Sequence, residues 1–166
     1  MPKTVRRDEL VAYLDRYLRV AEIPDSSPNG LQVQGSARVA KVAFAVDASV
    51  KTIRAAAAGR ASMLVVHHGL WWGKHEQIVG TMHARIAALI ENDLSLYAAH
   101  LPLDCHDEVG NNVELARLLG LRVESPFGRY QGVDIGVATV ARRTPRVRFV
   151  KAVEAARTQH GAPSTL

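Results

Sequence analysis

The sequence is poor in cysteine: Cys105 is the only one among 166 residues, so an internal disulfide cannot form. Such bonds are typical of secreted proteins, and their absence favours a cytoplasmic location. Apolar runs are also short. The run over residues 61–66 is far below the roughly 20 residues that a membrane helix requires. The basic N-terminal segment leads into acidic residues rather than into an apolar signal core, so we expect a cytoplasmic protein without membrane association.

Aromatic residues are scarce as well, at 5% of the chain, although the net charge is +5. A positive charge of this size can indicate an acidic partner such as a nucleic acid. The densest basic cluster, Arg142, Arg143, Arg146 and Arg148, contains no aromatic residues on which bases could stack. We therefore interpret it as a solvated basic face and rank nucleic-acid binding last among the functions considered.

Hydrophobic spacing predicts an alternation of strands and helices. Apolar residues recur three and four positions apart near the N-terminus, which predicts a first helix that ends before Pro24. The strands lack clean apolar–polar alternation and are separated by helices, which indicates an α/β fold with a mainly parallel sheet and helices on both faces. The predicted strands are 31–35, 39–46, 62–66, 94–98 and 133–140, and the later helices are 50–58, 78–91, 113–119 and 145–158.

Polar residues with metal-ligating chemistry follow two of these strands. His67 and His68 follow strand 62–66, and Asp104 lies a few residues after strand 94–98. Carboxyl ends of parallel strands meet at one edge of the sheet, where open α/β sheets bind ligands. Consecutive strand residues point to opposite faces, so we expect the strand to end before the histidines and the chain to turn at Gly69. An aspartate can then bridge two ions of zinc, iron or manganese that activate a water molecule.

Other residues near this edge allow two interpretations each. His100 could carry a proton or orient a ligand, or it could be a packed histidine. Asp47 could support the metal site, but capping of the helix that begins near residue 50 is the favoured interpretation. Trp71 and Trp72 could belong to the core or to a lid beside the site. A His-His pair without further ligands is also compatible with ordinary polar residues at a strand end.

Several segments together resemble a known family in order and spacing: residues 30–33, 45–49, 65–72, 96–104 and 109–112. They resemble the GTP cyclohydrolase 1 type 2 homologs, also called Nif-three-like proteins. The resemblance implies a dinuclear centre with His67, His68 and Asp104 as metal ligands. It also implies two ions per chain, a small-molecule substrate and assembly into ring-shaped homohexamers.

The C-terminal part departs from this family pattern. The family completes its centre with a histidine and a glutamate four residues later, whereas the residue four positions after His160 here is Ser164. Three remaining ligands would hold two ions weakly, because a catalytic zinc usually has three protein ligands of its own. We therefore expect a Nif-three-like metal-binding unit over residues 1–125 and an incomplete second half over 126–166.

Two functions are compatible with these features. The first is a metal-dependent hydrolase of a nucleotide or related heterocycle, with His100 as the proton carrier. The alternative is a non-enzymatic metal-binding or scaffold protein, inactive because the C-terminal ligands are missing. The sequence contains no Walker-type phosphate-binding loop that would support GTP as the specific substrate.

Overall fold

The computed structural model describes residues 3–74, 76–141 and 144–159, which form two compact units. The units divide between Leu103 and Asp104. A boundary at residue 125, as expected from the sequence, would fall inside strand β7 (Arg122–Tyr130). Strand β7 pairs antiparallel with β8 (Val133–Val140), and both strands lie in the second compact unit. The division into a metal-binding unit over 1–125 and a later part of the fold stays a prediction.

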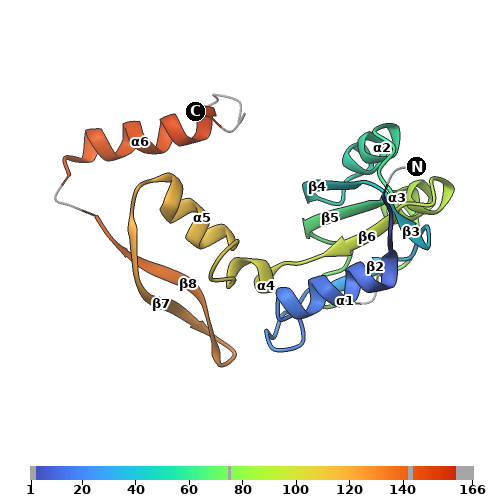
Figure 1. Ribbon diagram of the computed structural model, residues 1–166, viewed down its shortest axis with the longest axis horizontal. Helices are drawn as coiled ribbons and strands as arrows, with labels where there is room; N and C mark the ends of the chain where they lie inside the picture. Colours follow the sequence, from blue (N-terminus) through green and yellow to red (C-terminus); the bar gives the residue numbers. More distant parts are fainter. Residues whose placement is uncertain (1–2, 75, 142–143, 160–166) are drawn as a thin grey trace. The chain divides into compact units, whose positions relative to one another are not determined.

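The first unit is built on a four-stranded sheet with the order β2-β6-β5-β4 (Figure 1). Strands β4 (Val42–Asp47), β5 (Met63–His68) and β6 (Ser95–Ala98) are parallel, and β2 (Gly30–Val33) pairs antiparallel with β6. A separate short pair joins β1 (Val5–Arg6) to β3 (Arg38–Val39). The predicted α/β fold with a mainly parallel sheet is confirmed.

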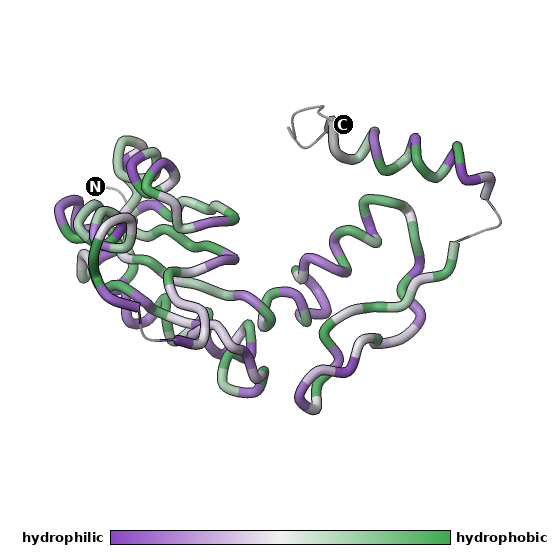
Figure 2. The backbone as a smooth tube through the Cα atoms, turned by 180° about the vertical axis from the view of Figure 1, so that it is seen from behind, coloured by the Kyte–Doolittle hydropathy of each residue, from purple (hydrophilic) through white to green (hydrophobic). Residues whose placement is uncertain are grey.

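Helices cover both faces of this sheet. On one face, Ile53 of α2 (Val50–Ala58) and Leu89 of α3 (Gly80–Glu91) share a buried cluster with Leu64 of β5. On the other, α1 (Arg7–Tyr17) contributes Leu14 to a cluster around Tyr97 of β6. The chain over the central strands is largely hydrophobic (Figure 2). Burial from both sides explains why these strands show little apolar–polar alternation.

The second unit begins at Asp104, the last residue of the single-turn helix α4 (Leu101–Asp104). It continues with α5 (Asn111–Leu118), the β7–β8 hairpin and α6 (Arg146–Gln159). Strand β7 was not predicted, because its sequence shows no strand pattern and contains Pro126 and Gly128, which are uncommon inside strands. The hairpin turn places Gln131 and Gly132 at φ angles of 44° and 91°, which suits a tight two-residue connection.

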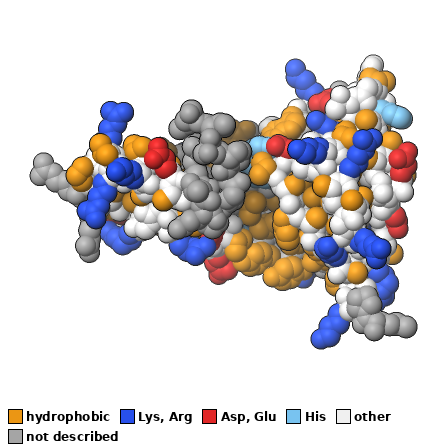
Figure 3. Space-filling view, turned by 90° about the horizontal axis from the view of Figure 1, so that it is seen from above, with side chains coloured by type: hydrophobic (Ala, Val, Ile, Leu, Met, Phe, Trp, Pro, Cys, Tyr) orange, Lys and Arg blue, Asp and Glu red, His pale blue; other side chains and the backbone are white. Residues whose placement is uncertain are grey.

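On the face of the first unit seen at the right of Figure 3, Lys and Arg side chains lie among apolar and neutral ones. Of the predicted basic cluster, Arg146 and Arg148 lie on α6, while Arg142 and Arg143 are outside the described residues, as is His160. Within the described ranges, no helix has the length and apolar character needed to cross a bilayer.

Candidate metal centre

The parallel register brings the histidines to one edge of the sheet. Strand β5 includes both His67 and His68, and His68 pairs directly with Asp47 at the end of β4. On the other side of β5, the Ala99 amide donates to the Val66 carbonyl at 2.9 Å, just before His100. The expectation that the strand would end before the histidine pair was therefore wrong, whereas its placement at the carboxyl edge follows from the topology.

The three histidines form a cluster. His67, His68 and His100 each offer one ring nitrogen, and these atoms lie within 4.8 Å of one another. Their ring centroids are separated by 4.6 to 5.7 Å. Trp72 packs edge-on beside two of them, with centroid distances of 5.5 Å to His68 and 4.9 Å to His100. Trp71 instead packs against the core, so the two tryptophans have different positions.

Each imidazole is oriented by an oxygen atom at its Nδ1. The His67 Nδ1 lies 3.1 Å from the Ala99 carbonyl oxygen. The Nδ1 of His68 lies 2.8 Å from Asp47 Oδ1, and that of His100 lies 3.0 Å from Asp25 Oδ2. A carbonyl or carboxylate oxygen accepts, so Nδ1 carries the proton and Nε2 is the atom that would coordinate a metal ion.

Asp25 holds His100 from the loop between α1 and β2. Its side chain is only 3% exposed, and burial alone would raise its pKa. Hydrogen bonds from Asn29, from the backbone of Ser27 and Leu101 and from His100 outweigh burial, so the pKa lies below the ordinary value. The result is a buried, ionised carboxylate that fixes the His100 ring.

Asp47 supports His68 rather than capping a helix. The N-cap of α2 is Ser49, whose Oγ accepts from the Thr52 amide at 3.1 Å. The Thr52 Oγ1 in turn accepts from the Ser49 amide at 3.0 Å, which completes a capping box. The favoured interpretation of Asp47 as a helix cap was therefore wrong, because the cap lies two residues further along the chain.

Gly69 has a different role from the turn that the sequence suggested. Its φ angle is outside the left-handed region, but a Cβ atom there would lie 2.3 Å from Gln32 Nε2. The Gln32 side chain accepts from the Leu70 amide at 2.7 Å and donates to the Pro28 carbonyl at 2.6 Å. Glycine therefore gives Gln32 room to tie β5 to the loop that contains Asp25.

Asp104 is the first residue of the second unit. Its Oδ1 accepts from Asn111 Nδ2 at 2.8 Å, and its carbonyl accepts from Asn112 Nδ2 at 2.9 Å. The structure thus groups His67, His68 and His100 within the first unit, and the assignment of Asp104 as a ligand stays a prediction.

Comparison with known proteins identifies the family to which the chain belongs. Residues 5–163 match Duf34/NIF3, described as NGG1p interacting factor 3. The chain belongs to the Duf34/NIF3 family. Proteins called GTP cyclohydrolase 1 type 2 homolog from Archaeoglobus fulgidus and Deinococcus radiodurans are 55% and 51% identical over 128 and 134 residues. The resemblance noted in the sequence is confirmed.

These matches cover only part of the relatives. The Archaeoglobus and Deinococcus alignments include 77% and 81% of this chain but 52% and 51% of the relatives. The chain therefore spans about half the length of the curated relatives it matches. The crystal structure of TTHA1606 from Thermus thermophilus superimposes with a TM-score of 0.82 at 45% identity, covering 91% of this chain and 61% of that one.

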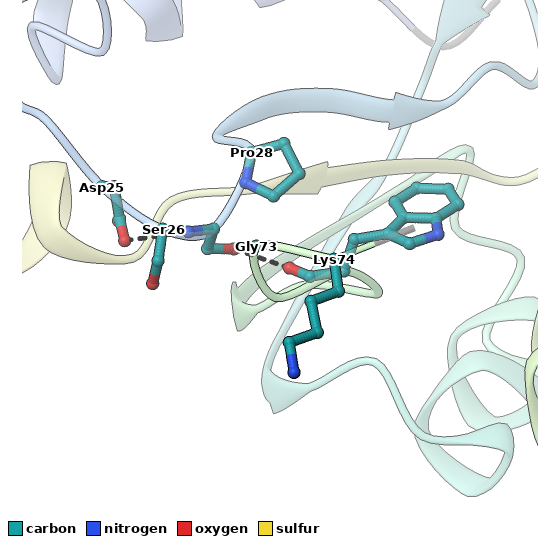
Figure 4. A pocket seen from close by; sticks show the side chains of 7 residues that line it. Asp25, Ser26, Pro28, Gly73 and Lys74 are labelled. Carbon is teal, nitrogen blue, oxygen red and sulfur yellow. Dashed lines mark hydrogen bonds between the residues drawn. The ribbon is translucent and has the colours of Figure 1, made fainter. Parts of the chain in front are cut away.

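Two hollows in this Duf34/NIF3 unit are lined by residues of the site: one by Asp25, the hydrogen-bond partner of His100, and the other by His68 itself. The larger, of about 430 Å³, has Trp71 and Lys74 in its wall together with Asp25 (Figure 4). In that view the Lys74 side chain extends away from Pro28. The smaller, of about 180 Å³, is lined by Asp47, Ala48, His68, Gly69, Trp72 and Arg85.

Sequence reasoning missed three residues of this site: Asp25, Asn29 and Arg85. Asp25 and Asn29 stand in a segment whose composition, Asp-Ser-Ser-Pro-Asn-Gly, indicates only a turn. The Asn29 Oδ1 accepts a hydrogen bond from the His100 amide at 2.7 Å and thereby fixes the backbone of the third histidine. A polar loop residue that contacts a residue 71 positions away leaves no local signal in the sequence.

Proposed function

We propose that this Duf34/NIF3 chain binds a divalent metal through His67, His68 and Asp104 and acts as a hydrolase of a nucleotide or related heterocycle. The observation that supports it most is the common orientation of the histidines. In each ring an oxygen atom engages Nδ1, the arrangement by which proteins present Nε2 to a metal ion.

The donor set fits such an ion. Imidazole nitrogens together with a carboxylate suit zinc, iron or manganese. When bound, a divalent ion supplies Lewis acidity that polarises the scissile bond or the attacking water. The Ala99 carbonyl and the Asp47 carboxylate hold the rings of His67 and His68 in place through their Nδ1 atoms. His100, fixed by the ionised Asp25, is placed to take up or release a proton at Nε2.

The larger hollow supports a heterocyclic substrate. Its volume of about 430 Å³ lies within the range of small-molecule sites, and the indole of Trp71 offers an aromatic surface. Lys74 adds a positive charge at its wall. Asp25 belongs both to this wall and to the His100 hydrogen bond, so a molecule held here would be one residue away from the proposed proton carrier.

The metal part is tested with the 166-residue chain loaded with zinc and then desalted. Metal content by mass spectrometry should fall in His67→Ala and Asp104→Ala but not in His83→Ala, an exposed histidine on α3. Equal zinc in the wild type and in His67→Ala would contradict the proposal. Zinc binding without hydrolysis of any nucleotide would support the alternative of a non-enzymatic metal-binding or scaffold protein.

The role of His100 is tested separately. His100→Gln should retain zinc and lose turnover, because Gln cannot exchange a proton at neutral pH. Loss of zinc in this variant would make His100 a ligand instead, since its ring nitrogen is within 4.8 Å of those of His67 and His68.

We further propose that copies of the chain associate, as the resemblance to a hexameric family implies. Phe44 and Val46 of β4 are 79% and 60% exposed, and β4 is the last strand of its sheet. Exposed apolar side chains along a sheet edge favour contact with another protein surface. Phe44→Glu should reduce the mass measured by light scattering, whereas Ile90→Glu on α3 should not. A monomeric wild type would refute this proposal.

A further inference from the structure

Arg85 of α3 occupies an unusual position beside the histidine cluster. It lines the 180 Å³ hollow together with His68, Asp47 and Trp72. Its Nε is buried and has no hydrogen-bond partner among the described residues. Leaving such a donor unsatisfied costs free energy, and more when the group is charged, so a guanidinium placed this way is unfavourable for stability alone.

The charge of Arg85 is not neutralised by a carboxylate within the described residues either. The one carboxylate in the wall of the hollow, Asp47, directs Oδ1 to His68 Nδ1 at 2.8 Å. The Arg85 side chain therefore lines a cavity whose other lining residues are Asp47, Ala48, His68, Gly69 and Trp72. A planar guanidinium with several N–H donors matches the geometry of phosphate and carboxylate oxygens.

The size of the hollow is compatible with a small oxyanion. At about 180 Å³ it has room for a tetrahedral group with five non-hydrogen atoms. The hollow beside Trp71, at about 430 Å³, has more room for a ring.

We propose that the 180 Å³ hollow binds a phosphate group, with the Arg85 guanidinium donating to its oxygens. This inference rests on the proposed hydrolase function and narrows its substrates to phosphorylated molecules. Asp47 also lines this hollow, and a carboxylate accepts a hydrogen bond only from an anion that keeps a proton. Inorganic phosphate keeps a proton near neutral pH and sulfate does not, so of these two probes we expect inorganic phosphate to bind more tightly.

The test uses the 166-residue chain and inorganic phosphate as the probe. NMR spectra that resolve arginine Nε–Hε groups are recorded during titration, once with zinc and once after chelation. The Arg85 signal, assigned by its loss in Arg85→Gln, should shift with saturation in both states. Sulfate at equal ionic strength should bind at least about tenfold more weakly. Arg85→Lys should bind phosphate more weakly than the wild type, because an ammonium cannot make the paired contacts.

Arg54→Gln is the matched control, since Arg54 is an exposed arginine on the neighbouring helix α2 and its loss changes the net charge equally. It should leave phosphate binding unchanged. Phosphate binding is followed in Arg85→Gln through the remaining signals of the chain. Binding that requires zinc and is as tight in Arg85→Gln as in the wild type would overturn the inference, because phosphate would then bind the ion alone. Equal affinity for sulfate would overturn the part assigned to Asp47. Metal content is measured on the same samples, so failure of the metal proposal is seen independently.

Discussion

Replacing Asp47 with asparagine should weaken metal binding without disturbing the fold. The Asp47 carboxylate accepts the His68 Nδ1 proton at 2.8 Å, and an asparagine side chain would keep an acceptor oxygen of the same size while losing the charge. Removing such a partner of a ligating histidine typically lowers metal affinity about 10- to 100-fold. Because the Asp47 side chain is 65% exposed, water screens its charge, and we expect the lower limit of this range. A tenfold loss corresponds to about 1.4 kcal/mol.

The assay is competition for zinc against a chromophoric chelator, with Glu91→Gln as the control. Glu91 is an exposed carboxylate at the end of α3, so this variant changes the net charge by the same amount away from the histidines. An unchanged zinc affinity in Asp47→Asn would refute the assignment of Asp47 as the residue that orients His68. Equal losses in both variants would show that general electrostatics, rather than the His68 hydrogen bond, causes the effect.

Three further predictions concern stability. The pKa of Asp25 is depressed from its ordinary value of 3.8. The stability that its ionised form contributes is therefore present above that pH and is lost as the pH falls through the folded-state pKa. The free energy of unfolding in urea, measured from about pH 6 to about pH 3, should fall more steeply for the wild type than for Asp25→Asn. Gly69→Ala should cost roughly 1–3 kcal/mol, because the new methyl group displaces Gln32 from the Leu70 amide; the cost should shrink in a Gln32→Ala background, and an undiminished cost there would contradict this cause. Ser49→Ala should cost about 1 kcal/mol, and Asp47→Ala should leave the helix cap intact by circular dichroism.

The parallel core could be predicted because its signals are local. Helix α2 has the bounds that the spacing of apolar residues and Gly59 indicated, and strands β4, β5 and β6 overlap the predicted apolar runs, although β4 begins at Val42 and β5 continues through His68. The β7–β8 hairpin gives the opposite case. Its first strand is exposed along most of its length, so no buried face imposes a pattern on the sequence, and only pairing with β8 defines it.

The site was predictable to the extent that topology determines it. Strand polarity places His67, His68 and His100 at one edge, and this follows from reading the strands as parallel. The partners of their Nδ1 atoms depend on register and on loop structure. The pairing of Asp47 with His68 requires the register of β4 against β5, and the contact of Asp25 with His100 joins residues 75 positions apart. Neither of these two contacts leaves a local pattern in the sequence.

The three Nδ1 partners argue together for a metal centre more strongly than the histidines do alone. A histidine that only fills space needs one partner, and many acceptors would serve. Here a backbone carbonyl and two carboxylates from separate segments all engage the same ring position, although one carboxylate is buried and the other exposed. Burying Asp25 costs free energy that its hydrogen bonds must offset. Coordination through Nε2 requires this tautomer in His67 and His68, and in His100 the same tautomer leaves Nε2 as the nitrogen that would accept a proton in the proposed reaction.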